Sequence, residues 1–121
     1  MKIFINFSNH PSAQWTQTQL DAAAEYGEVA DIPFPAVPSE ASCDDVGNMA
    51  DRYIAQIMAM NPSAVMCQGE FTLAFAVASK LKSLGVPVLA ACSERKVMEK
   101  AETSITRKIA VYEFVQFRNY I

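Results

Sequence analysis

Short apolar runs alternate with helical segments along most of this chain, and that alternation restricts its fold more than any other feature. The runs cover residues 2–7, 28–33, 64–67 and 87–92. They lack a clean alternation of apolar and polar positions, which is typical of strands buried on both faces. Such strands, with a helix between each pair, predict a parallel sheet joined by right-handed crossovers.

Three helices are expected between the runs: one that follows residues 8–12 and ends at Gly27, one over residues 46–60, and one over residues 71–84. The apolar residues of the second fall at helical spacing. Ser42 or Asp44 can cap it at its start, and Gly85 ends the third.

The last part of the chain follows a different pattern. Residues 108–120 (KIAVYEFVQFRNY) are rich in aromatic and β-branched side chains, and they predict one long strand, antiparallel at the sheet edge. Residues 95–100 are either its hairpin partner or a mobile loop. We therefore expect one α/β domain over residues 1–121: a Rossmann-like open, mostly parallel sheet with helices on both faces and a C-terminal antiparallel edge strand or hairpin.

Composition limits the possible environments of the chain. No apolar run approaches the roughly 20 residues of a membrane helix, and the N-terminus is too short for a signal peptide. The three cysteines, Cys43, Cys67 and Cys92, form neither an even framework nor a CxxC pair, so we expect reduced thiols in the cytoplasm. Because His10 is the only histidine, we expect no zinc site and no metal or other cofactor.

The charges are unevenly distributed. The net charge is −3, yet most acidic residues lie within residues 21–51 and most basic ones within residues 80–118. This asymmetry can give one face a positive potential. A chain that is acidic overall is not expected to bind duplex nucleic acid, but a small anionic ligand fits.

Three polar segments directly follow predicted strands: residues 8–15, residues 68–72 and residues 93–95. Ligands of open parallel sheets bind beyond the carboxyl ends of the strands. We therefore expect these segments to converge on one site.

The first polar segment offers hydroxyl, amide and imidazole groups near a helix start, in Ser8, Asn9, His10, Ser12 and Gln14. Backbone N–H groups at such a place favour a phosphate, and His10 is a natural acid or base. The alternative is structural, with Ser12 as a helix cap and His10 as a turn residue. The sequence has neither GxGxxG nor a P-loop motif.

The second polar segment places an acid between the end of a predicted strand and the start of a predicted helix. Glu70 either favours the helix dipole, or binds ribose hydroxyls and positions a nucleophile while Gly69 admits a ligand to the backbone. Gln68, Phe71 and Thr72 are further candidate contacts.

In the third segment, Ser93 is a candidate ligand contact and Arg95 supplies positive charge to a phosphate or an oxyanion. The alternative for Arg95 is a surface salt bridge with Glu94 or Glu99. The aromatic tail strand could also join two copies of the chain.

Four stretches, INFSNHPS, VMCQGEF, ACSERKV and YEFVQFRNY, together resemble small stand-alone proteins of type III CRISPR systems. These look like minimal versions of the CRISPR-associated Rossmann-fold (CARF) domain, of the ring nuclease type. The resemblance implies a homodimer that binds a cyclic oligoadenylate, with cyclic tetra-adenylate preferred, and cleaves it without a metal to switch off signalling. The chain lacks the obvious Ser–Lys pair of the better-known ring nucleases.

The resemblance also implies roles for the candidate residues. Phosphate contacts fall to Ser8, Asn9 and Gln68. His10 acts as general acid or base, Glu70 positions or deprotonates the ribose 2′-hydroxyl, and Arg95 steadies the transition state.

Three alternatives stay open on the sequence. One is a non-catalytic sensor or sponge for the same ligand, and another is glycosyl transfer on a nucleoside or NAD with Glu70 as nucleophile. The third is a structural protein that interacts through its tail strand. Residues 94–105 are also a candidate lid.

Overall fold

The fold is built on one five-stranded sheet. The structure is a computed structural model that describes residues 1–101 and 105–121. The strands are β1 (Ile3–Ser8), β2 (Glu28–Pro33), β3 (Ala64–Cys67), β4 (Val88–Ala101) and β5 (Thr106–Asn119), in the order β2-β1-β3-β4-β5. The first four strands run parallel, and β5 pairs antiparallel with β4 at the edge.

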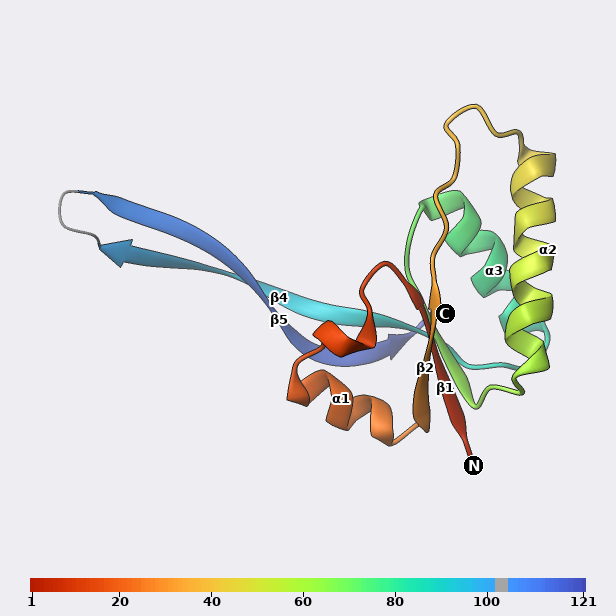
Figure 1. Ribbon diagram of the computed structural model, residues 1–121, viewed down its shortest axis with the longest axis horizontal. Helices are drawn as coiled ribbons and strands as arrows, with labels where there is room; N and C mark the ends of the chain where they lie inside the picture. The colour runs from red at the N-terminus through yellow and green to blue at the C-terminus, as the bar shows by residue number, and fades with distance from the viewer. Residues whose placement is uncertain (102–104) are drawn as a thin grey trace.

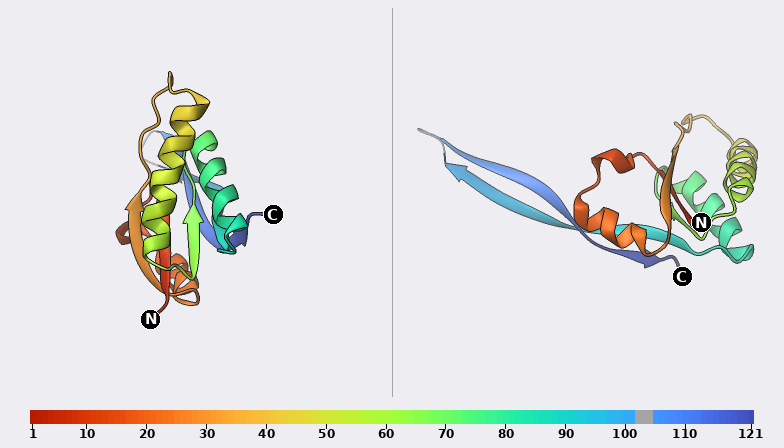
Figure 2. Two further views of the ribbon diagram at one scale, coloured as in Figure 1. Left: turned by 90° about the vertical axis from the view of Figure 1, so that its right-hand side faces the viewer. Right: turned by 60° about the horizontal axis from the view of Figure 1, so that its bottom comes forward.

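Helices cover both faces of the sheet (Figures 1 and 2). A short 3-10 turn, η1 (Ser12–Gln14), leads into α1 (Gln17–Ala24) on one face, and α2 (Cys43–Ala59) and α3 (Phe71–Ser83) lie on the other. The expected α/β fold, Rossmann-like with a C-terminal antiparallel hairpin, is therefore confirmed.

The sheet divides the core in two, because successive residues of a strand point to opposite faces. On β1, Phe4 packs with Trp15 and Ala23 on the α1 side, while Ile5 and Phe7 join the larger cluster beneath α2 and α3. All three β1 side chains are fully buried.

Helix α2 begins earlier than the apolar spacing predicts. Ser42 is its N-cap: the Ser42 hydroxyl accepts the Asp45 N–H, and the Asp45 carboxylate accepts the Ser42 N–H. This reciprocal capping box stabilises a polar first turn that hydrophobic periodicity does not detect. Of the two expected caps, Ser42 is right and Asp44 is wrong.

Strands β4 and β5 continue past the body as a two-stranded ribbon, here called the arm (residues 94–101 and 106–113; Figure 1). The predicted end of the fourth strand at residue 92 is therefore too early. Of the two interpretations of residues 95–100, the hairpin partner is right and the mobile loop is wrong. The candidate lid, residues 94–105, includes residues 102–104, which lie outside the described residues.

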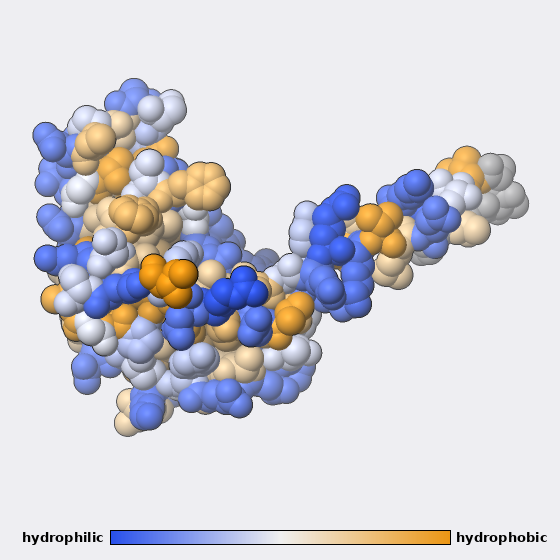
Figure 3. Space-filling model, turned by 180° about the vertical axis from the view of Figure 1, so that it is seen from behind, coloured by the Kyte–Doolittle hydropathy of each residue, from blue (hydrophilic) through white to orange (hydrophobic). Residues whose placement is uncertain are grey.

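Charged and apolar side chains are interspersed along the arm, which stands clear of the body (Figure 3). Val97, Met98 and Tyr112 are each more than half exposed. Because both faces of this ribbon meet solvent, its sequence lacks the buried pattern by which the other strands are found. Within the described ranges, no helix has the length and apolarity needed to cross a membrane.

Candidate functional site

A cavity of about 560 Å³ lies at the carboxyl ends of β1 and β3, beside Ala91 and Ser93 in the first half of β4. The chain continues from β1 to β2 on one side and places β3 on the other, so the boundary between β1 and β3 is the topological switch point where open α/β sheets bind ligands. We call this space the switch cavity.

The three polar segments meet at the switch cavity. From the first come Ser8, Asn9, His10 and Gln14, from the second Gln68 and Gly69, and from the third Ser93. Four other candidates, Ser12, Glu70, Phe71 and Thr72, lie outside its lining, as does Arg95. The sequence missed six lining residues: Thr16, Gln19, Met66, Ala91, Tyr112 and Phe114.

A buried asparagine in β1 shapes the loop that forms one wall. Asn6 Nδ2 donates to the His10 carbonyl and to the Asp31 carboxylate, both at 2.9 Å. The Ser8 hydroxyl donates to Asn6 Oδ1 at 2.6 Å and accepts the His10 N–H at 3.1 Å. Trp15 Nε1 also donates to the His10 carbonyl, at 3.0 Å. This network fixes the loop backbone and leaves the exposed imidazole of His10 at the cavity.

Ser12 is held by an acid. Its N–H and hydroxyl donate to the Asp31 carboxylate at 3.2 Å and 3.0 Å, and its side chain caps no helix. A carboxylate at this turn occupies the donors expected to bind a phosphate and repels a second anion. The geometry therefore favours a structural role for Ser12, though not the helix cap considered for it.

Glu70 is the N-cap of α3. Its carboxylate accepts the Thr72 hydroxyl at 2.6 Å, the Thr72 N–H at 2.8 Å and the Leu73 N–H at 3.1 Å. These hydrogen bonds, from the Thr72 hydroxyl first and then from the two backbone N–H groups, lower the pKa of Glu70 below its ordinary value. The structural alternative for Glu70 thus has direct geometric support, and Thr72 serves the same cap.

Gly69 leaves space for the aromatic ring of Phe34 beside the backbone. A Cβ atom at this position would lie 2.5 Å from ring atoms of Phe34, a buried side chain. The Oε1 atom of Gln68 accepts the Ala91 N–H at 2.6 Å, which links β3 to β4 beyond their last paired residues, Met66 and Leu89.

Arg95 lies just outside the cavity on the arm. Ser93 pairs with Phe114, and Arg95 pairs with Tyr112. Cross-strand partners share a face and so do residues two apart, so Arg95 lies on the face that lines the cavity, one step further out. Among the described side chains Arg95 forms neither salt bridge considered for it, whereas Lys96 pairs with Glu113 at 2.8 Å.

Gln19 is the most informative lining residue that the sequence patterns did not single out. It lies on α1, is 5% exposed and lines the switch cavity. Its Nε2 is a buried polar atom that has no hydrogen-bond partner in the described part of the chain. Trp15, Gln19 and Ala23 follow one another at a spacing of four residues, which puts Gln19 on the inner face of the helix. That spacing was the available signal.

An open α/β sheet with a polar cavity at its switch point defines this chain as a small Rossmann-like protein with a candidate ligand site. Residues 2–118 match the model described as the Uncharacterized protein MJ1673 family, and the chain belongs to that family. No curated protein matches the chain at a significant level.

Proposed function

We propose that this chain binds a cyclic oligoadenylate in the switch cavity, with cyclic tetra-adenylate as the preferred ring, and serves as a sensor or sponge in cytoplasmic type III CRISPR signalling. The observation that carries the proposal is the buried, unpaired amide of Gln19 at a cavity on the switch point. A buried donor without a partner calls for an explanation, and a ligand or an ordered water that enters the cavity supplies one.

The chemistry of the cavity suits an adenosine unit. Gln14, Gln19 and Gln68 bring carboxamides, which match the adjacent donor and acceptor of the adenine edge. Tyr112 and Phe114 bring aromatic rings on which a base can stack.

The charges suit phosphates at the rim of the cavity. Its described lining holds no lysine or arginine, so the interior takes the nucleoside. Arg95, one step outward on the same face of the arm, is placed for a phosphate. The choice of an oligoadenylate over other nucleotides rests on the sequence resemblance.

Binding has more support than cleavage. Of the three residues expected to carry catalysis, His10 alone lines the cavity. The oxygens of Glu70 are engaged in the α3 cap, which also removes the support for glycosyl transfer with Glu70 as nucleophile.

Ring opening remains the second candidate because of His10. In that reaction the imidazole takes the proton of a 2′-hydroxyl, the 2′-oxygen bonds to the adjacent phosphorus, and the bond from phosphorus to the 5′-oxygen breaks, with the leaving 5′-oxygen taking a proton from water. The products are a 2′,3′-cyclic phosphate and a 5′-hydroxyl, and no metal is required.

A homodimer is part of the proposal. A cyclic oligoadenylate repeats the same unit, so two copies related by a two-fold axis would present the same contacts twice. The arm supports this arrangement because an isolated two-stranded ribbon is marginally stable in water.

The test measures binding and turnover together. Purified protein in EDTA is titrated calorimetrically with cyclic tri-, tetra- and hexa-adenylate, and the products are resolved by chromatography and mass. We expect stoichiometric binding of one ring without products. Multiple turnover to linear products that His10→Ala abolishes would show that the protein is a ring nuclease and not only a binding protein.

A matched pair of variants locates the site. Gln19→Met removes the buried amide, whereas Gln17→Met changes an exposed glutamine of the same helix that donates to Asp21. We expect weaker binding for Gln19→Met alone. Binding of no ring by the unmodified protein would overturn the proposal and direct the search to nucleosides and NAD.

A further inference from the structure

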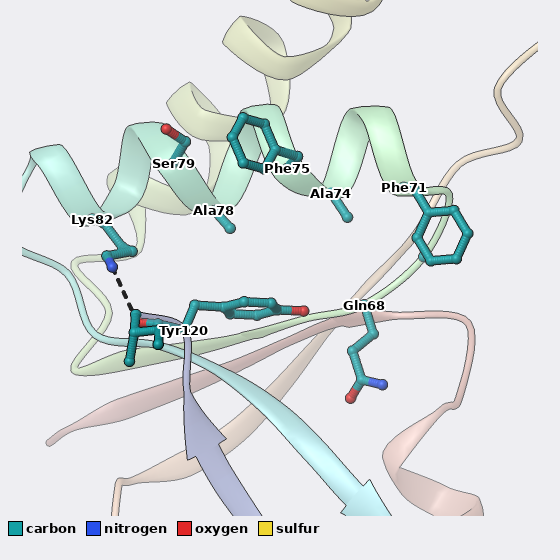
Figure 4. Close-up of a pocket in the computed structure, with 10 residues that line it drawn as sticks. Gln68, Phe71, Ala74, Phe75, Ala78, Ser79, Lys82 and Tyr120 are labelled. Atoms are coloured by element: carbon teal, nitrogen blue, oxygen red, sulfur yellow. Dashed lines mark hydrogen bonds between the residues drawn. The ribbon is translucent and has the colours of Figure 1, made fainter.

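A second groove, of about 640 Å³, runs between α3 and the end of the chain (Figure 4). Phe71 and Phe75 line it and are 89% and 75% exposed. Aromatic side chains so exposed on a concave surface mark a binding site more often than a packing defect. We call this space the stacking groove.

Tyr120 forms a fixed wall of the stacking groove. Its hydroxyl donates to the Cys67 carbonyl at 2.7 Å, and its backbone N–H donates to the Val88 carbonyl at 2.9 Å. Burial raises the pKa of Tyr120, so the hydroxyl remains a donor at neutral pH. The ring is held at both ends with its face toward the groove.

The opposite wall is made of small side chains. Ala74 and Ala78 of α3 point toward the Tyr120 ring in Figure 4, and their short methyl groups leave room for a flat group between helix and ring. Lys82 closes one end, where its Nζ donates to the Tyr120 carbonyl at 3.1 Å.

The two cavities adjoin at the end of β3, because Gln68 and Gly69 line both. Gln68 uses its oxygen on the Ala91 N–H, which leaves the amide N–H groups for a ligand that crosses this point. A ligand larger than one nucleotide that passes the end of β3 would therefore contact both cavities.

We propose that the stacking groove is a second nucleotide subsite, in which an adenine of the ligand stacks on the Tyr120 ring beside Ala74 and Ala78, with Phe75 at the rim of the groove, while its phosphate approaches Lys82. This inference rests on the proposed function and adds to it the place where a second adenine of the ligand binds. Stacking on aromatic side chains needs only the flat face of a base, and an ammonium group supplies the charge for the phosphate.

The test compares ligands of different length. AMP fills one subsite, and linear di-adenylate and cyclic tetra-adenylate reach both. Affinities are measured for the unmodified protein and for Phe75→Ala, Tyr120→Ala and Tyr120→Phe. The control is Leu84→Ala, which removes a half-exposed side chain at the end of α3 that lines neither cavity.

We expect Phe75→Ala and Tyr120→Ala to weaken di-adenylate and cyclic tetra-adenylate roughly 5- to 150-fold and to leave AMP unchanged. Tyr120→Phe keeps the ring and loses less. Phe75 is exposed, so we expect Phe75→Ala to keep the fold. The test therefore remains informative even if Tyr120→Ala is destabilised.

The two proposals fail differently. If AMP and both longer ligands bind and Phe75→Ala and Tyr120→Ala change nothing, the second subsite is refuted and the switch cavity stands. If those variants weaken the longer ligands but Gln19→Met does not, the groove stands and the switch-cavity assignment fails. If none of the three adenylates binds, both proposals are overturned. This outcome includes the case in which the groove binds a polypeptide instead.

Discussion

Replacement of Gln19 by methionine should make the protein more stable and a poorer binder at the same time. Gln19 is 5% exposed, and its Nε2 lacks a partner within the described residues. A buried polar group without a hydrogen bond costs about 1–3 kcal/mol, and an apolar replacement of the same shape removes that cost. Methionine is as long as glutamine and as good a helix former, so the helix itself is unaffected.

The size of the effect follows from the length of the chain. With 121 residues, each kcal/mol corresponds to roughly 4 °C in melting temperature. We expect Gln19→Met to melt about 4–12 °C higher without ligand. Loss of one neutral hydrogen bond, about 0.5–1.5 kcal/mol, should weaken the ligand roughly 2- to 12-fold.

Calorimetric unfolding and ligand titration on one preparation measure both effects, the gain in stability and the loss of affinity. The control Gln17→Met should stay within about 0.5 kcal/mol, because the residue is exposed and does not line the cavity. A Gln19→Met variant that is less stable and binds as tightly as the unmodified protein would refute the reasoning, since the amide would then be a satisfied structural group.

Three more predictions concern residues near the site. Glu70→Gln should lower stability at neutral pH and flatten its acid dependence, because a carboxyl with a depressed pKa contributes stability that is lost as the pH falls below its ordinary value of 4.5; equal pH–melting profiles would contradict the cap. Gly69→Ala should cost about 1–3 kcal/mol in denaturant unfolding, because its Cβ meets the Phe34 ring at 2.5 Å; an unchanged midpoint would show that the ring yields freely. Burial raises the pKa of Cys67 to about 12, so at pH 8 iodoacetamide should label exposed Cys43 and spare Cys67, as peptide mass mapping would detect.

The order of strands and helices in the body could be predicted from local patterns. Apolar runs such as residues 64–67 are buried on both faces, and helices such as α3 end near the expected glycine. These signals depend on neighbours in the chain, so they are visible without a structure. The convergence of polar segments at one sheet edge followed from the parallel topology alone.

The roles of single residues were less accessible. Glu70 and Ser12 are polar residues beside a strand end, and such residues suit a ligand or a turn equally well. The structure separates the two uses, because Glu70 accepts N–H groups of its own helix and Ser12, in the turn after β1, donates to Asp31 of β2. The contact with Asp31 spans 19 residues and depends on the pairing of β1 with β2.

By itself, therefore, the sequence determined the parallel α/β sheet, the antiparallel final strand and the edge at which a site forms, because burial on both faces and turn chemistry are local properties. The tertiary structure decided the rest. Packing of α1 on the sheet buried the amide of Gln19, and the register of β4 with β5 extended both strands into the arm. The last part of the chain brings Tyr120 to the end of β3, where its ring forms one wall of the stacking groove. The burial of Gln19 and the stacking groove join residues far apart in the chain, and the free energy of such contacts depends on distances that only the folded molecule sets.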